Sequence, residues 1–340
     1  PHHPYTRPPL SKQILVGEWE PADAAIRSAA ELDDLAIELR TSCTARGLDL
    51  ASRTLRTSTG DVAFDELVIA TGTEPRRHPL VPAALTLRTV DDALVLRERL
   101  RAARSVVVVG AGILGSEIAS AARKHDVRTL VLGRSGTLTF GGVGSLLADR
   151  LAALHAEHGV DLALSADIVA ADDSGLTLAD GTVHTADLIV SMIGGTPRTR
   201  WLSSSGLDVR DGVACDSEGR AAQGVSAVGD VAAWADPYTG RPVRVEHQSN
   251  AVEQAVAVAL RLVHGEPASQ PVPLFWSELH GTRINAYGWF DPEIPLVPFD
   301  NPNVLVSRDG DRVHGAVGWG ATPRDFRPAR AAVATPLVHH

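Results

Sequence analysis

The sequence has very few cysteines. Only Cys43 and Cys215 occur in 340 residues; they are far apart and form no CxxC pair. A zinc site, an iron–sulfur cluster or a disulfide framework needs several cysteine or histidine side chains at short spacings. The thirteen histidines form no HxxxH or HExxH pattern. The sequence therefore predicts no metal site and no disulfide framework, and we expect a reducing cytoplasm as its location.

Long apolar runs and positive charge are also scarce. No run approaches the roughly 18 apolar residues of a membrane span, and no export signal is visible. The net charge of -9 argues against nucleic-acid binding, which needs a basic face. No G-x-S-x-G motif supports a serine hydrolase. The chain has 44% hydrophobic and 21% charged residues, which is typical of a globular protein, and its length suits two or three domains.

The clearest element that is present lies in residues 104–134. An apolar, β-branched run ends in Gly110-x-Gly112-x-x-Gly115, and a helical stretch and a second apolar run follow. This is the order of a βαβ dinucleotide-binding unit. There the first glycine permits a tight turn, the second lets the backbone approach a pyrophosphate, and the third lets helix and strand pack closely.

The end of the second apolar run bears on which nucleotide would bind. An acidic residue usually holds the ribose 2′-hydroxyl of NAD at this place, but the sequence reads Leu132-Gly133-Arg134-Ser135. Arg134 suits a 2′-phosphate and therefore favours NADP. A solvated loop arginine is the other interpretation, and the choice between NADH and NADPH stays open.

Further apolar runs end in glycine, as expected for stacked nucleotide-binding units. One ends at Thr71-Gly72, one at Gly194, and one at Gly229-Asp230. Residues 249–264 have helical spacing, and Ser249 or Asn250 is the expected N-cap. Gly141, Gly142 and Gly144 form another glycine cluster without the dinucleotide fingerprint. Short predicted strands follow residues 265–273, which read as a linker.

The order of these motifs resembles the FAD- and NAD(P)-dependent ferredoxin and rubredoxin reductases. These glutathione-reductase-like flavoproteins serve oxygenases and cytochromes P450. The similarity runs nearly from end to end, and the two C-terminal segments argue against the disulfide reductases. The matching segments are YTRPPLSK (5–12), LVIATGTEPR (67–76), LRTVDDA (87–93), VVVVGAGILGSEIA (106–119), GVSAVGDVA (224–232), VRVEHQSNAVEQA (243–255), PLFWSELHGTRINAYG (273–288) and ATPRDFRPARAAV (321–333).

The resemblance implies an α/β fold with two Rossmann-like three-layer nucleotide-binding domains, the first truncated at its N-terminus, and a small C-terminal α+β domain. An FAD-binding domain is expected at 1–98 and 213–265, an NAD(P)-binding domain at 99–212, and a C-terminal reductase or interface domain at 268–340. The implied function is electron transfer from NAD(P)H through FAD to a ferredoxin or rubredoxin. The protein would be a monomer or a homodimer.

The resemblance also implies the site residues. Lys12 and Glu117 match a catalytic pair near flavin N5, in which the carboxylate holds the cation in place. Trp276 matches an aromatic residue beside the flavin. The remaining positions match cofactor contacts: Arg7, Ala45, Thr71, Gly72, Arg88, Asp230 and Gln248 for FAD, and Gly110, Gly112, Ile113, Gly115, Arg134 and Gly194 for NAD(P). The acceptor is expected to dock near Trp276, with Arg283, Arg324, Arg327 and Arg330 as basic candidates.

One expected element is missing. The family's FAD domain begins with its own βαβ unit of about 30 residues, and this sequence opens after the place of that unit. A fragment of a longer product is one explanation, favoured by Pro1 in place of Met. The other is a flavin-free NAD(P)-binding module without reductase activity. A peroxide-linked flavoenzyme needs a cysteine beside the flavin, and Cys43 lies away from the 8–12 turn.

Overall fold

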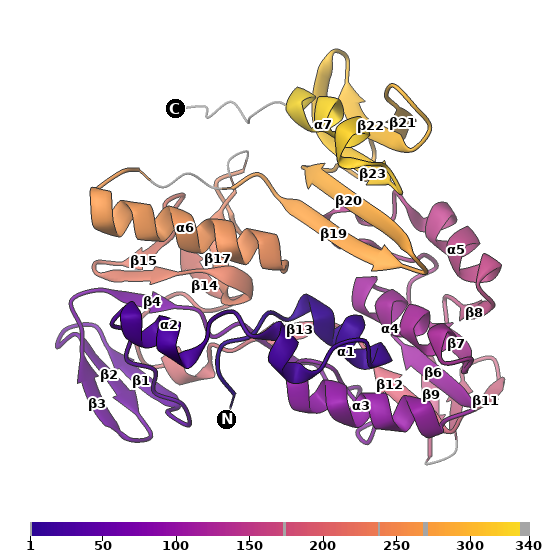
Figure 1. Ribbon diagram of the computed structural model, residues 1–340, viewed down its shortest axis with the longest axis horizontal. Coiled ribbons are helices and arrows are strands. Elements are labelled where there is room, and N and C mark those ends of the chain that lie inside the picture. The colour runs from indigo at the N-terminus through magenta and orange to yellow at the C-terminus, as the bar shows by residue number, and fades with distance from the viewer. Residues whose placement is uncertain (1, 173–174, 237–238, 268–270, 334–340) are drawn as a thin grey trace.

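The computed structural model describes residues 2–172, 175–236, 239–267 and 271–333, arranged as three groups of elements (Figure 1). Among these residues, no helix is both long and apolar enough to cross a membrane. The N-terminal segment extends across the two larger groups, with its first helical turns on one and its last helix in front of the other (Figure 1). It contains η1 (Pro8–Ser11), α1 (Gln13–Val16), η2 (Pro21–Ala24) and α2 (Ala29–Asp34).

The middle of the chain folds around a parallel sheet with the strand order β12-β6-β7-β8. Its central strand β6 is buried at all five positions, as expected for a parallel strand covered on both faces. The elements of this group are α3 (Val90–Ala102), β6 (Ser105–Val109), α4 (Ile113–Lys124), β7 (Arg128–Leu132), η3 (Gly141–Val143), α5 (Ala148–Glu157), β8 (Val160–Ala163), β9 (Ile168–Ala171), β10 (Gly175–Leu178), β11 (Val183–Thr185) and β12 (Leu188–Ser191).

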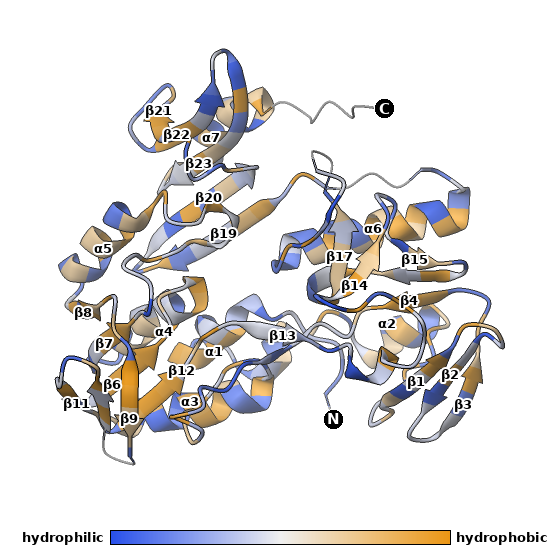
Figure 2. Cartoon of the chain, turned by 180° about the vertical axis from the view of Figure 1, so that it is seen from behind, coloured by the Kyte–Doolittle hydropathy of each residue, from blue (hydrophilic) through white to orange (hydrophobic). Residues whose placement is uncertain are grey.

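Alternate side chains of β6 belong to two different cores. Val106 and Val108 pack with helices α3 and α4, whereas Val107 and Val109 pack with the antiparallel sheet β11-β10-β9. This alternation follows from the two-residue period of a strand. The group therefore has three layers, and Figure 2 shows its inner strands as strongly hydrophobic.

A second group combines chain segments from both sides of the first. Strands β4 and β16 pair in parallel, and their core includes Trp234 and Val258. The elements are β1 (Ala45–Asp49), β2 (Thr54–Thr57), β3 (Gly60–Ala63), β4 (Leu67–Ile69), β5 (Thr73–Pro75), β13 (Gly195–Pro197), η4 (Arg200–Leu202), β14 (Val213–Cys215), β15 (Arg220–Ala222), β16 (Val225–Ala227), η5 (Gly229–Val231), β17 (Ala232–Ala235), β18 (Pro242–Arg244) and α6 (Gln248–His264).

Apolar surface is exposed in this second group. Strand β4 is the edge of the sheet β15-β16-β4, and its Val68 is 42% exposed. Helix α6 carries Val252, Val256 and Val263, which are also exposed. A sheet edge and apolar side chains that are exposed in this way are surfaces on which further protein could pack.

The C-terminal group is a five-stranded antiparallel sheet in the order β19-β20-β23-β22-β21, with α7 packed on β22 and β23. Its elements are β19 (Leu274–Leu279), β20 (Thr282–Gly288), β21 (Leu296–Pro298), β22 (Val304–Asp309), β23 (Arg312–Trp319) and α7 (Pro323–Ala332). Strand β19 also packs against α4, which connects this group to the middle one (Figure 1).

The second glycine cluster has a packing role. A Cβ atom built on Gly141 or Gly142 would lie 2.8 or 2.6 Å from ring atoms of Phe275, which is closer than real side chains come. These glycines therefore let the η3 turn lie against the buried Phe275 ring of β19. The close approach explains a glycine pair that carries no nucleotide fingerprint.

Candidate active site

Lys12 and Glu117 meet at the junction of η1 and α4. Lys12 Nζ lies 2.6 Å from Glu117 Oε1, and only 13% and 9% of the two side chains are exposed. Glu117 is in the second turn of α4, directly after the glycine fingerprint, so the βαβ unit itself aims this carboxylate at the N-terminal segment. The fold thus brings the predicted pair together; its catalytic role stays a prediction.

Two serines hold the Glu117 carboxylate from either side. Ser277 Oγ on β19 donates to Oε1 at 2.5 Å, and Ser11 Oγ donates to Oε2. Both serines are buried. Together with Lys12, they satisfy the carboxylate in a site with little water, where an unpaired charge would be costly. A pocket lined by Lys12, Glu117 and the exposed Glu278 opens beside the pair.

Trp276 lies between two cations. Lys12 Nζ is 5.4 Å and Arg283 Cζ is 5.2 Å from the centre of its ring, distances at which a cation is attracted to an indole face. Lys12 is nearly buried, whereas Arg283 is exposed. The indole therefore joins the enclosed ion pair to the molecular surface.

Helix α6 begins differently from our expectation. We predicted Ser249 or Asn250 as the N-cap, but the N-cap is His247, whose Nδ1 accepts a hydrogen bond from Ser249 N at 3.2 Å. Asn250 is buried within the first turn and donates to the Val245 carbonyl at 3.1 Å. The Asn250 side chain is therefore buried and bonded to Val245, and it does not cap the helix.

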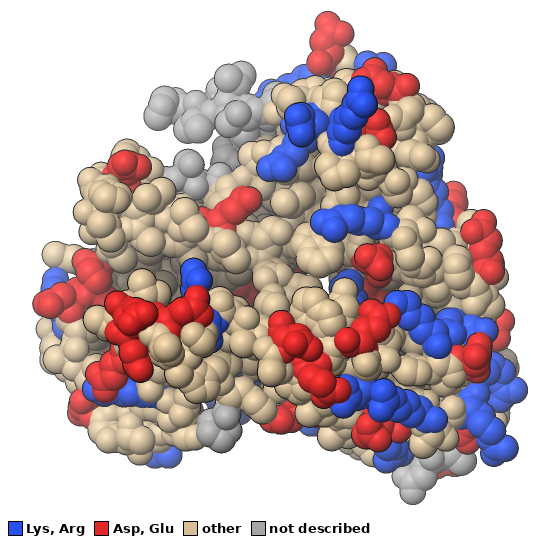
Figure 3. Space-filling model, in the orientation of Figure 1, with Lys and Arg blue, Asp and Glu red and all other residues tan. Residues whose placement is uncertain are grey.

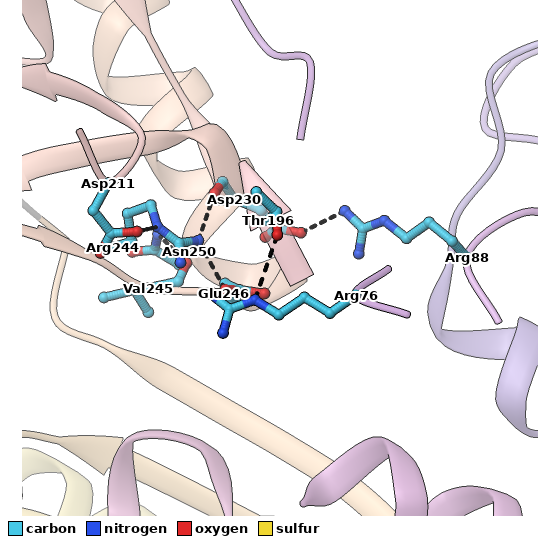
Figure 4. A network of polar contacts seen from close by, with 9 residues as sticks. All are labelled: Arg76, Arg88, Thr196, Asp211, Asp230, Arg244, Val245, Glu246 and Asn250. Atoms are coloured by element: carbon cyan, nitrogen blue, oxygen red, sulfur yellow. Dashed lines mark hydrogen bonds and ion pairs between the residues drawn. The ribbon is translucent and has the colours of Figure 1, made fainter. Parts of the chain in front are cut away.

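A cluster of arginines surrounds Asp230 at the end of β16. Arg88 Nη2 lies 2.8 Å from Asp230 Oδ2, and Arg244 Nη1 donates to the Asp230 carbonyl at 3.0 Å. Figure 4 shows Arg88 and Arg244 approaching Asp230 from opposite sides. Arg244 is also paired with Asp211 and Glu246, whereas the buried Nε of Arg88 has no hydrogen-bond partner among the residues that the structure describes.

The cluster meets the backbone at Gly72. A Cβ atom at this position would lie 3.1 Å from Arg88 Nη2 and 3.5 Å from Arg7 Nη1. The Arg7 side chain reaches solvent, yet partial burial and the charge of Arg88 lower its pKa. Two close guanidinium groups and the Arg88 Nε without a described partner would suit an anionic group such as a dinucleotide phosphate.

Thr71, the residue before Gly72, makes a different contact. Its Oγ1 donates to the Arg198 carbonyl at 3.0 Å.

The glycine fingerprint forms a tight turn that has no room for side chains at its first and third glycines. Gly110 has a φ of +127°, and a Cβ there would collide with the Met192 carbonyl. Gly115 packs against the Gly110 carbonyl, so it also cannot carry a side chain. At Gly112, the N-cap of α4, the nearest atom to a Cβ would be Thr139 Oγ1 at 3.8 Å. The N-terminus of α4, where Ile113 begins the helix, is thus open to a phosphate.

The packing of the loop after β7 explains why no acidic residue stands at the place where NAD-binding units usually have one. A Cβ at Gly133 would lie 2.7 Å from Ala111 Cβ and 2.9 Å from Leu164 Cδ2, so no acidic side chain fits there. Arg134, the next residue, is exposed. Gly194 has a φ of +90° and open space around its α-carbon. Both residues lie just beyond the carboxyl ends of parallel strands.

The remaining predicted residues are less closely joined to the site. Gln248 Nε2 donates to Thr6 Oγ1 at 2.7 Å, near the start of the N-terminal segment. Ala45 lies at the start of β1, whose described contacts are with β2 and η4. Residues 268–270 of the expected linker and 334–340 of the expected C-terminal domain lie outside the described residues. Sequence reasoning missed His247, Ser277 and Arg244, because each acts through contacts with distant segments.

Comparisons with known proteins identify the family of the chain. Residues 1–255 match the family described as pyridine nucleotide-disulphide oxidoreductase. The chain is 33% identical to rhodocoxin reductase of Rhodococcus erythropolis, over 85% of this chain and 70% of the relative. It is 30% identical to the ferredoxin–NAD(+) reductase subunit of the benzene 1,2-dioxygenase system of Pseudomonas putida, over 99% and 85%.

A solved structure has the same fold. The covalent putidaredoxin reductase–putidaredoxin complex matches with a TM-score of 0.89 and 27% identity, over 99% of this chain and 85% of that one. This agreement supports the expected α/β architecture of nucleotide-binding domains with a C-terminal domain. The chain belongs to the pyridine nucleotide-disulphide oxidoreductase family.

Proposed function

We propose that this protein is an NAD(P)H-dependent ferredoxin reductase. It takes electrons from NAD(P)H through FAD and passes them to a ferredoxin or rubredoxin that supplies an oxygenase or a cytochrome P450. The observation that carries the proposal is the enclosed Lys12–Glu117 pair, which adjoins Trp276 and joins the N-terminal segment to the middle and C-terminal groups. The relatives named as reductase components of oxygenase systems support the same activity.

The Asp230 cluster is the place that fits FAD. Arg88 and Arg7 would hold phosphate oxygens at Gly72, and the Asp230 carboxylate would accept a hydrogen bond from a polyol hydroxyl. Thr71, Gln248 and Ala45 are further proposed contacts. FAD supplies the ability to accept two electrons and release them one at a time. Lys12, held by Glu117, would place a fixed positive charge where reduction adds negative charge.

The middle group is proposed to bind NAD(P)H. Gly110, Gly112, Ile113 and Gly115 would receive the pyrophosphate at the N-terminus of α4, and Gly194 would line the nicotinamide side. Arg134 would meet a 2′-phosphate. On this assignment, residues 99–212 bind NAD(P), residues 1–98 with 213–265 bind FAD, and residues 268–340 form the interface domain.

The acceptor is proposed to dock around Trp276 and α7. Arg283 is exposed over the Trp276 ring, and its backbone carbonyl accepts from Gly320 N just before α7. Arg324 and Arg327 are exposed on α7, and Figure 3 shows basic side chains gathered over this helix. Arg330 lies 4.5 Å from the Tyr287 ring. This local positive charge would attract an acidic iron–sulfur protein despite the net charge of -9. We place the reaction in the cytoplasm, where NAD(P)H is available.

The absorbance spectrum of the purified full-length gene product tests the cofactor assignment. We expect a flavin band near one flavin per chain, with the band bleached when NAD(P)H is added without oxygen. Arg88→Gln should lower the flavin content, because it removes the guanidinium at Gly72, while the exposed Arg324→Gln serves as a control. A protein that binds NAD(P)H but never contains flavin would instead be a nucleotide-binding module.

A further inference from the structure

His247 connects two elements that belong to different groups. Its Nδ1 lies 3.2 Å from Ser249 N at the start of α6. Its Nε2 lies 3.2 Å from the carbonyl oxygen and 3.1 Å from the amide nitrogen of Trp276 on β19. The imidazole thus touches both the helix that begins beside Asp230 and the strand that carries the indole over Lys12.

These contacts select one protonation state. Ser249 N–H can only donate, so Nδ1 must be an acceptor without a proton. A neutral imidazole then has its proton on Nε2, which donates to the Trp276 carbonyl. An imidazolium would carry a proton on both nitrogens and would oppose the Ser249 N–H. The Trp276 N–H, 3.1 Å from Nε2, also points at the ring. The neutral Nε2–H tautomer makes two of the three contacts and leaves the Trp276 N–H without an acceptor on the ring. The Nδ1–H tautomer would accept that N–H but would lose the bonds to Ser249 N and the Trp276 carbonyl.

The surroundings favour this neutral form. Burial lowers the pKa of His247, and the Lys12 charge adds to that effect, whereas Trp276, Glu117 and Asp230 act in the opposite direction. The ring also packs at steep angles against Phe275 and Trp276, with centroids 5.5 and 6.3 Å away. The imidazole is therefore held on several sides by residues of β19 and faces charges from η1, α4 and η5.

We propose that His247, as the neutral Nε2–H tautomer, is a positioning residue that ties the Trp276 backbone to the N-terminus of α6. The consequence for electron transfer rests on the proposed function. Trp276 contacts Lys12, and α6 begins beside the proposed flavin site, so this bond sets the spacing between the two elements. Protonation breaks the cap of α6 and places a second cation near Lys12, so the connection is lost as the pH falls.

Imidazole NMR tests the tautomer without any dependence on flavin. The full-length protein, labelled with ¹⁵N in histidine, is compared with His247→Asn to assign the His247 signals. We expect a protonated Nε2 and an unprotonated Nδ1 that persist from about pH 7.5 to about pH 5.5, where exposed imidazoles gain a proton. A proton on Nδ1, or protonation of the ring within that pH range, would overturn the proposal.

Steady-state kinetics test the positioning. Asparagine is a good N-cap but is too short to reach Trp276, so His247→Asn should keep α6 and lose only the connection. We expect kcat with putidaredoxin as the acceptor to fall about fivefold, the factor that one neutral hydrogen bond corresponds to, with KM for NAD(P)H unchanged. The matched control is His264→Asn. If His247→Asn retained the parent kcat and its pH profile, the positioning role would be wrong. A flavin-free protein would refute the proposed function but leave the NMR result valid.

Discussion

Lys12 and Glu117 come from distant parts of the chain and meet with 2.6 Å between Nζ and Oε1, almost out of contact with water. Neither charge is well solvated by water, because bulk water is largely excluded, and Ser11 and Ser277 supply the other hydrogen bonds to the carboxylate.

Loss of the buried carboxylate should destabilise the protein far more than loss of a surface one. Glu117→Gln leaves the Lys12 ammonium enclosed without its counter-ion, and we expect the free energy of unfolding to fall by about 3 kcal/mol. Glu18→Gln is the matched control, because it breaks the exposed pair with Lys124 at 3.3 Å and should cost less than about 1 kcal/mol. Urea unfolding of both variants measures the difference. Equal costs would mean that the Lys12–Glu117 pair is not buried in solution.

Arg134 should determine the preference for a 2′-phosphate. Arg134→Ala is expected to lower kcat/KM for NADPH by about tenfold or more, because a hydrogen bond to a charged group is lost, and to leave the value for NADH unchanged. Arg128→Ala, at the opposite end of β7, should alter neither value. A parent enzyme with a strong preference for NADH would contradict the role proposed for Arg134.

Two histidines, His155 on α5 and His280 at the β19–β20 turn, should make stability depend on pH. Burial, with the nearby His158, lowers the pKa of His155 to about 4, and burial, with His155 and His158, lowers the pKa of His280 to about 3. The unfolded histidines bind protons near 6.5, so their contribution is complete above that pH and is lost as the pH falls toward 4. For the buried His155 we expect a loss of about 2–3 kcal/mol.

Urea unfolding at about pH 7 and about pH 5 measures the larger part of this loss, about 2 kcal/mol. His155→Gln should flatten the pH dependence, since Gln does not titrate, and the exposed His264→Gln should leave it as in the parent. An unchanged slope in His155→Gln would show that other groups cause the acid sensitivity.

The two cysteines should differ sharply in reactivity. Burial raises the pKa of Cys215 to about 12, whereas hydrogen bonds from Thr57 and Thr59 lower the pKa of Cys43. We expect a thiol reagent to modify Cys43 rapidly in the folded protein and Cys215 only after unfolding. Cys43→Ser should remove the rapid phase and keep reductase activity. Loss of activity in Cys43→Ser would support the peroxide-linked flavoenzyme instead.

Local patterns predicted the parts of the fold that depend on local chemistry. The Val-rich run 105–109 and its glycine turn predicted β6 and α4, since a tight turn and a doubly buried strand leave a clear pattern. The predicted N-cap of α6 was wrong. Serine and asparagine are common N-cap residues, so Ser249 and Asn250 were reasonable predictions, but the burial of Asn250 depends on tertiary packing that the local sequence does not show. A serine within a strand does not indicate a functional role in the sequence either. The role of Ser277 follows only from its hydrogen bond to Glu117 in the structure. The pairing of Lys12 with Glu117 came from the family resemblance.

Electron transfer from NAD(P)H to an iron–sulfur acceptor is the central claim, and anaerobic stopped-flow spectroscopy tests it most directly. The purified full-length protein is mixed with NADH or NADPH and oxidised putidaredoxin, and the flavin and iron–sulfur bands are followed together. The account predicts rapid loss of the flavin band followed by reduction of the iron–sulfur protein, with the second step slowed by high salt and by Arg283→Gln. A protein that binds the nucleotide but reduces neither centre would contradict it.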